Sequence, residues 1–190
     1  MSQQKLLTSV LDVLESMDIP YFVTGSWASS LQGEPRSTHD LDLVVSLAIH
    51  KVPGLLAAFA SPDYYLSDVS VKEAIHHQSM FNLLDNRSGD KVDFWMLTNE
   101  SWDQERFARR TTIQLYNRDV RITTPEDTIL AKLRWSKLSG GSEKQFADAL
   151  RVYEVQRSAL DVEYIAKWAT QLDVADLWQR LQQEADSGEP

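Results

Sequence analysis

The segment Asp40-Leu41-Asp42-Leu43-Val44-Val45 carries the most informative pattern of this 190-residue chain. Carboxylates at positions i and i+2 of a strand point to the same face, because successive side chains alternate between faces. A third acid, Asp93, lies in the similar apolar run Lys91-Val92-Asp93-Phe94-Trp95-Met96-Leu97. If the two runs form neighbouring strands, three carboxylates make an all-oxygen site of the kind that holds Mg²⁺ together with substrate phosphates. The pattern predicts metal-assisted phosphoryl or nucleotidyl transfer.

Each acid also has an ordinary interpretation. An Asp-x-Asp pair can form the solvated face of an edge strand, since polar and apolar residues alternate in half-buried strands by default. The neighbours Leu41, Val44 and Phe94 are strongly apolar, however, which favours central strands. An unpaired carboxylate is costly there. Its repetition on two strands favours a bound cation.

Gly25-Ser26 follows the apolar run 21–24 and opens a predicted helix. A glycine lets the backbone approach a phosphate closely, and N–H groups at a helix start, with the Ser26 hydroxyl, can donate to triphosphate oxygens. The alternative for Ser26 is a simple helix N-cap. Arg36 and Thr38, just before the paired acids, either orient phosphate or cap the entry to the strand.

In this order, Gly25-Ser26, Asp40-Leu41-Asp42 and Val92-Asp93-Phe94 resemble the signature of the nucleotidyltransferase superfamily related to DNA polymerase beta. Segments 124–133 and 139–148 resemble the small bacterial nucleotidyltransferase-like proteins around the AbiEii toxin and its single-domain relatives. The resemblance covers about residues 5 to 182. It implies an α/β (α+β) nucleotidyltransferase fold, with a mixed central sheet flanked by helices and a C-terminal helical region.

The resemblance also implies roles for individual residues. It assigns catalysis to Asp40, Asp42, Asp93, Lys132 and Asp148, and nucleotide binding to Gly25 and Ser26. Arg36 and Thr38 are further nucleotide-binding candidates because of their position before the paired acids. Asp40, Asp42 and Asp93 become the ligands of Mg²⁺, as two ions, and Asp93 is also a candidate general base. A nucleoside triphosphate is the implied donor, and Lys132 contacts its phosphates. In the ordinary alternative, Lys132 extends to solvent at a helix edge and Asp148 pairs with Arg151 or Lys144.

Composition indicates a cytoplasmic protein. Zero cysteines fit a reducing compartment, and no apolar stretch has the length needed to cross a membrane. A net charge of −9 argues against non-specific nucleic-acid binding as the main task. Locally, Arg106, Arg109, Arg110, Arg118 and Arg121 form a basic stretch that is followed by Lys132, Arg134 and Lys137. This stretch is either a set of solvated charges or a landing site for a triphosphate or an RNA acceptor.

Periodicity predicts an α/β core over residues 1–123, a helical region over 124–186 that packs on the core, and a tail at 187–190. In the core we expect helices at 3–17, 26–32, 49–59, 69–78 and 102–109, and strands at 21–24, 40–46, 80–85, 91–97, 111–116 and 119–123. Beyond it we expect helices from Pro125 to Gly140, from Ser142 to about 155, at 161–171 and at 174–184. Thr124 and Ser142 are the expected N-caps.

Three functions are compatible with these patterns. The first is a Mg²⁺-dependent transferase that moves a nucleoside monophosphate from a nucleoside triphosphate to a hydroxyl group on tRNA or another RNA, a protein or a small molecule, with release of pyrophosphate. The second is a non-catalytic nucleotide-binding or interaction module of a toxin–antitoxin-like system. The third is a structural partner in a two-component system, which requires a cognate partner protein.

Overall fold

The computed structural model describes residues 3–36 and 40–187. The chain divides into two compact units. The first, called the sheet unit, takes its described residues from 1–24 and 38–122. The second, called the helical unit, takes its described residues from 25–37 and 123–190. Each unit therefore contains two separate segments of the chain.

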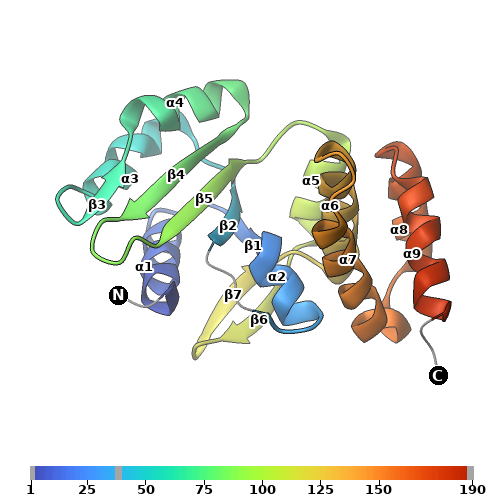
Figure 1. Cartoon of the computed structure of the whole chain (residues 1–190). Helices are drawn as coiled ribbons and strands as arrows, with labels where there is room; N and C mark the ends of the chain where they lie inside the picture. The colour runs from blue at the N-terminus through green and yellow to red at the C-terminus, as the bar shows by residue number, and fades with distance from the viewer. Residues whose placement is uncertain (1–2, 37–39, 188–190) are drawn as a thin grey trace. The chain divides into compact units, whose positions relative to one another are not determined.

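The sheet unit is built on a mixed sheet with the strand order β3-β4-β5-β2-β1-β7-β6 (Figure 1). The strands are β1 (Tyr21–Thr24), β2 (Asp40–Val45), β3 (Tyr64–Leu66), β4 (Met80–Asp85), β5 (Lys91–Met96), β6 (Thr111–Leu115) and β7 (Arg118–Ile122). Strands β2 and β5 pair in parallel, as do β1 and β7, and the other neighbours are antiparallel. The predicted fold class is confirmed, and β2 lies at the centre of the sheet.

One face of the central strands is apolar and forms the core of the sheet unit. Leu43, Val45, Val92 and Phe94 are all buried, as expected for alternate residues of strands that are covered on that side. Phe94 stacks on Phe81 of β4 at a ring-centroid distance of 4.8 Å. The helices of this unit are α1 (Gln3–Ser16), the 3₁₀ turn η1 (Ile49–Lys51), α3 (Val52–Ala58), α4 (Asp68–His77) and α5 (Ser101–Arg109).

Two elements of the sheet unit differ from the sequence-based expectation. Strand β3 was not predicted, because it is a three-residue edge strand defined by backbone pairing with β4 rather than by an apolar run. The single helix expected at 49–59 begins as the 3₁₀ turn η1, and the α-helix starts only at Val52. Pro53 lies in the first turn of α3, where its missing N–H has no intrahelical partner to lose.

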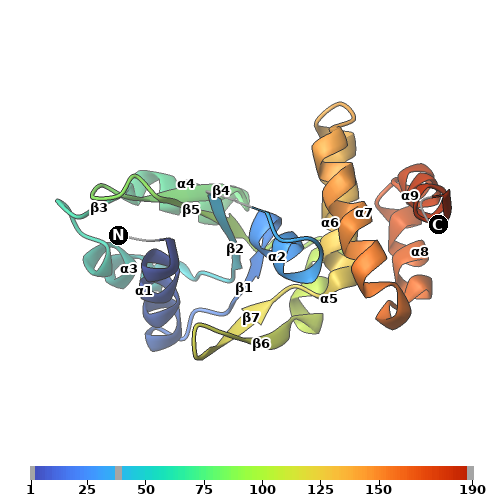
Figure 2. The same ribbon diagram turned by 60° about the horizontal axis from the view of Figure 1, so that its bottom comes forward.

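The helical unit consists of α2 (Gly25–Gln32), α6 (Pro125–Leu138), α7 (Glu143–Gln156), the 3₁₀ turn η2 (Arg157–Ala159), α8 (Val162–Gln171) and α9 (Ala175–Ser187). Helices α6 and α7 run side by side in both views (Figures 1 and 2). Helix α2 packs on both of them. The Gln32 side chain donates to the Thr123 carbonyl over 2.6 Å and accepts from the Thr128 hydroxyl over 2.6 Å. These buried bonds fix the end of α2 against the start of α6.

Gly33 allows α2 to end close to α7. A Cβ atom at this position would lie 3.0 Å from the Val152 nitrogen and 3.0 Å from the Ser29 oxygen, which are both backbone atoms. Thr124 caps α6 as predicted, because its hydroxyl accepts from the Asp127 N–H. Ser142 precedes α7 without a side-chain cap hydrogen bond, and α9 continues to Ser187, beyond the expected end at 184. None of the helices in the described part of the chain is long and apolar enough to cross a membrane.

Candidate active site

The predicted acids lie side by side on the two central parallel strands. Asp42 of β2 and Asp93 of β5 are register partners, and Asp40 is the partner of Lys91. Because Asp40 and Asp42 are two residues apart, as are Lys91 and Asp93, all four side chains share one face of the sheet. The predicted placement of the three acids on neighbouring strands is confirmed.

Each acid has a polar partner on this face. The Lys91 ammonium lies 2.9 Å from Asp93 Oδ2 and 3.9 Å from Asp40 Oδ1. Asn82 of β4, the register partner of Asp93, donates its side-chain N–H to Asp93 Oδ1. The Trp95 indole N–H donates to Asp42 Oδ1 over 3.2 Å. Sequence reasoning missed these partners, although the i, i+2 alternation along β5 already placed Lys91 and Trp95 on the face of Asp93.

The carboxylates act electrostatically on Lys91. The hydrogen bond with Asp93 is the largest influence and raises the pKa of the Lys91 ammonium. Burial opposes this shift but is the smaller influence, and the negative charges of Asp93, Asp40 and Asp42 add to the rise. The shared face is therefore a region of negative potential that already attracts one cation.

The same face can be compared with the needs of Mg²⁺. Carboxylate oxygens are its preferred protein ligands, and two of the three acids approach a single ammonium. Among residues 3–36 and 40–187, however, no group of three or more His, Cys, Asp or Glu side chains is placed to hold a metal ion. The three carboxylates are the type of donor that Mg²⁺ prefers, and they lie on one face of the sheet. They are not arranged around one common point, however.

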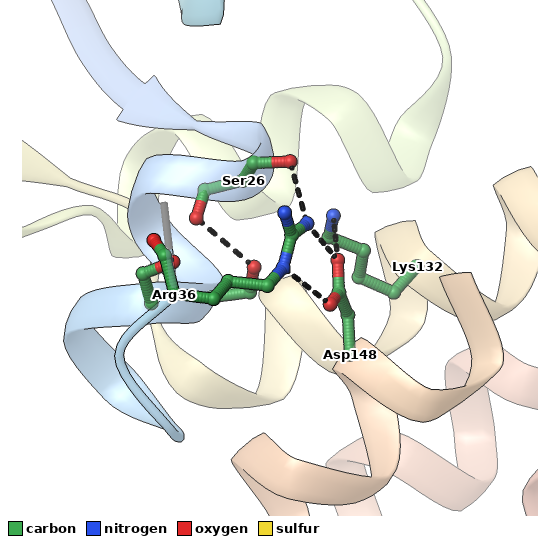
Figure 3. A network of polar contacts seen from close by, with 6 residues as sticks. Ser26, Arg36, Lys132 and Asp148 are labelled. Atoms are coloured by element: carbon green, nitrogen blue, oxygen red, sulfur yellow. Dashed lines mark hydrogen bonds and ion pairs between the residues drawn. The ribbon is translucent and has the colours of Figure 1, made fainter. Parts of the chain in front are cut away.

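A second polar cluster lies in the helical unit and joins Ser26, Arg36, Lys132 and Asp148 (Figure 3). Arg36 donates to both oxygens of Asp148, from Nε over 2.9 Å and from Nη2 over 2.7 Å. Lys132 Nζ lies 2.7 Å from Asp148 Oδ2. Arg36 Nη2 also donates to the Ser26 hydroxyl over 2.9 Å. One carboxylate thus holds two cations, which leaves the cluster with a net positive charge.

Burial and charge act in opposite directions on Asp148. Burial is the largest single influence and raises the pKa of its carboxyl, but the hydrogen bonds and positive charges of Arg36 and Lys132 together hold the pKa below its usual value. The bond to Asp148 in turn raises the pKa of Arg36. Asp148 is therefore ionised in the folded protein at neutral pH.

The ordinary alternative for Lys132 and Asp148 is wrong. The Lys132 side chain is only 5% exposed, so it does not extend to solvent from a helix edge. Asp148 pairs with Arg36 and Lys132 rather than with a neighbour on its own helix. Arg151 pairs instead with Glu154 over 2.7 Å.

The remaining predicted nucleotide-binding residues have different outcomes. Gly25 is the first residue of α2 and has φ of +65°, a conformation that favours glycine. Ser26 lies inside α2 rather than before it, and its hydroxyl accepts from Arg36. Thr38 lies outside the described residues.

The predicted basic stretch is largely engaged with its own neighbours. Arg118 binds Asp12 over 2.7 Å and Glu15 over 2.6 Å. Arg106 pairs with Asp103, and Arg110 lies over the ring of Phe107. A landing site for triphosphate or RNA on this stretch stays a prediction.

The family model of aminoglycoside-2''-adenylyltransferase matches residues 6–131, about two thirds of the 190 residues. The chain belongs to this family. Its members are nucleotidyltransferases, so the chain is a nucleotidyltransferase enzyme. The match spans the strands that carry the three acids and ends within α6. The finer resemblance to AbiEii-like proteins stays a prediction.

Solved structures of similar fold include other nucleotidyltransferases. The chain is similar to ANT(2'')-Ia in complex with adenylyl-2''-tobramycin, with a TM-score of 0.59, 14% identity, and coverage of 91% of this chain and 98% of that one. It is similar to the lincosamide antibiotic adenylyltransferase LnuA bound to lincomycin, with a TM-score of 0.55, 12% identity, and coverage of 82% and 98%.

An antigenic nucleotidyltransferase-like protein from Paracoccidioides brasiliensis aligns with a TM-score of 0.55 at 20% identity, over 94% of this chain and 91% of that one. No curated protein sequence gives a significant match. Because these sequence identities are low, the structural likeness shows that this chain has the same fold as these proteins.

Proposed function

We propose that the protein transfers an adenylyl group from ATP to a hydroxyl group of a small molecule and releases pyrophosphate, with Mg²⁺ bound at the acidic face. The observation that carries the proposal is the register of Asp42 and Asp93 on the central parallel strands, with Asp40 on the same face. The family model names adenylyl transfer. Two of the similar structures hold a bound antibiotic or its adenylylated form, which favours a small acceptor over RNA or protein.

The chemistry follows from the character of the acidic face. The acceptor oxygen forms a bond to the α-phosphorus of ATP, the bond between that phosphorus and the oxygen leading to the β-phosphate breaks, and pyrophosphate leaves with the bonding electrons. In this proposal Asp93 takes the proton of the acceptor hydroxyl, because it is the most buried of the three acids and lies beside Asp42 on the neighbouring strand. Asp40, Asp42 and Asp93 would hold magnesium, which would stabilise the charge on the phosphates.

The cluster of the helical unit fits the binding of phosphate oxygens. Arg36 and Lys132 present cationic donors, and Asp148 holds both in place. Such preorganised donors recognise phosphate without having to reorient. In this proposal Arg36, Lys132 and Ser26 form a binding site for phosphate oxygens, while Asp148 acts through the two cations as a positioning residue.

The acceptor is expected to be neutral or cationic. The chain has a net charge of −9, which disfavours close approach of a polyanion such as RNA. A small hydroxyl-bearing compound with amino groups is attracted by the same charge.

The test is calorimetric binding of each nucleoside triphosphate, with and without Mg²⁺, to the wild type and to Asp42→Asn. Asp68→Asn is the matched control, because Asp68 is an exposed acid on α4 that pairs with Lys72. We expect Mg²⁺-dependent binding of ATP by the wild type and the control, and its loss in Asp42→Asn. Pyrophosphate release with a panel of amino-sugar and other hydroxyl acceptors then identifies the acceptor class.

Retained binding and turnover in Asp42→Asn would contradict the assignment of the acidic face. If no triphosphate binds the wild type, the alternative of a non-catalytic interaction module is supported instead.

A further inference from the structure

Lys91 is placed as a counter-ion for two carboxylates of the acidic face, Asp93 and Asp40. It lies on the same face of β5 as Asp93, two residues away, and its register partner on β2 is Asp40. Its ammonium is 2.9 Å from Asp93 Oδ2 and 3.9 Å from Asp40 Oδ1. One ammonium therefore lies close to two of the three carboxylates on this face.

This pair differs from an ordinary surface ion pair. In the exposed pair of Lys72 and Asp68, the side chains are 53% and 46% exposed, so water already solvates both charges. The Asp93 side chain is only 12% exposed and lies on a central strand. A carboxylate in that setting requires a nearby cation or donor, because its loss of hydration is costly.

Lys91 can also leave this position. Its side chain is 38% exposed, and a lysine ammonium is a strongly hydrated point charge on a flexible stem. Moving the Lys91 ammonium into water costs little free energy if another cation binds the carboxylates in its place. Phosphate oxygens that arrive with a metal would offer the displaced ammonium a new partner.

We propose that Lys91 is a resident counter-ion that holds the carboxylate face in the metal-free protein and yields its position to the divalent metal. Lys91 thereby keeps binding of the metal alone weak and makes it depend on the triphosphate. This inference rests on the proposed function, because it concerns the same metal-binding face. It adds a role for a residue that the metal-ligand pattern does not include.

The test uses Mn²⁺ alone as the probe, titrated calorimetrically into metal-free protein. An opposite charge within about 4–6 Å changes the proton affinity of a carboxylate by about one to three pKa units. Removal of the ammonium in Lys91→Met should therefore tighten binding of another cation to the same carboxylates by about tenfold or more. Lys91→Arg keeps the charge and should bind Mn²⁺ like the wild type. Lys72→Met removes a matched surface lysine and should also bind like the wild type.

A second readout follows from the same displacement. Without metal, Lys91→Met should unfold at a lower denaturant concentration than the wild type, and saturating Mn²⁺ should restore more stability to the variant than to the wild type. If the methionine variant does not fold, Lys91→Gln tests the same loss of charge with a polar side chain.

Mn²⁺ affinity that is unchanged or weaker in Lys91→Met overturns the inference, as does the absence of Mn²⁺ binding by both proteins. Its failure is distinct from failure of the proposed function. Unchanged Mn²⁺ affinity in Lys91→Met, together with Asp42-dependent turnover in the wild type, overturns only the role of Lys91. Tighter Mn²⁺ binding by Lys91→Met in a protein without turnover supports that role and counts against the transferase.

Discussion

Replacement of Asp148 by alanine should destabilise the helical unit strongly. The Lys132 and Asp148 side chains are 5% and 10% exposed, and their charged atoms are 2.7 Å apart. At an effective dielectric constant of about 20, two unit charges at that distance attract by about 6 kcal/mol. The desolvation of both groups offsets much of this attraction. The main destabilising effect of Asp148→Ala is that the buried Lys132 ammonium loses the carboxylate beside it.

Loss of one partner of a buried pair costs about 3 to 5 kcal/mol. Arg36 and Lys132 have further interactions, so we expect the lower end, about 3 kcal/mol. For a chain of this length, that loss lowers the melting temperature by about 10 °C. Chemical denaturation of the wild type and Asp148→Ala, followed by circular dichroism, measures the change in unfolding free energy.

Glu143→Ala is the matched control on the same helix. Glu143 also accepts two hydrogen bonds from an arginine, Arg180, but this pair is exposed, and its removal should change stability little. The double variant Lys132→Met/Asp148→Leu replaces the charges by apolar groups and should recover part of the loss. The reasoning is refuted if Asp148→Ala is no more destabilising than Glu143→Ala.

Three further predictions follow from local contacts. Gly33→Ala should lower stability by about 1 to 3 kcal/mol, because the new Cβ meets fixed backbone atoms 3.0 Å away. Gly54→Ala meets only the flexible end of a methionine side chain and should cost little. Thermal unfolding of both variants distinguishes them. Tyr164→Phe removes the hydroxyl that donates to fully buried Asp127 over 2.7 Å and should cost about 1 to 3 kcal/mol in denaturant unfolding; a stability equal to that of the wild type would contradict this role. Because the pKa of Asp148 is lowered from 3.8, the stabilising effect of its carboxylate should be complete above about pH 4 and should disappear at lower pH. The difference in unfolding free energy between the wild type and Asp148→Asn should therefore shrink on acidification. A difference that grows would contradict the lowered pKa of Asp148.

The central strands could be predicted correctly because the apolar runs and the spacing of the acidic residues both indicated strands at the same positions. Apolar runs predicted β2 and β5, and the i, i+2 spacing placed Asp40 and Asp42 on one face. Their parallel pairing put Asp93 beside Asp42. Most helices could likewise be predicted from periodicity, since each buries one stripe of apolar residues.

Other features depended on contacts that a linear pattern does not contain. Strand β3 exists because its backbone pairs with β4. The neutralising role of Lys91 requires the register between β5 and β2, since only the paired strands bring its ammonium near Asp40. Asp148 has candidate partners close by on α7, yet it binds Arg36, which is 112 residues away in the chain. Sequence proximity was a poor guide for long charged side chains.

The division of the helical unit between two chain segments has a consequence for synthesis on the ribosome. Gln32 and Thr123, whose hydrogen bond fixes the end of α2, are 91 residues apart. Helix α2 therefore emerges long before α6 and α7, and the apolar Ala28 and the polar Ser29 and Gln32, all buried in the finished fold, have no partners from the helical unit during that interval. Closure of so long a loop is entropically costly and slow. The nascent chain is thus expected to expose α2 to chaperones until the C-terminal helices have been synthesised.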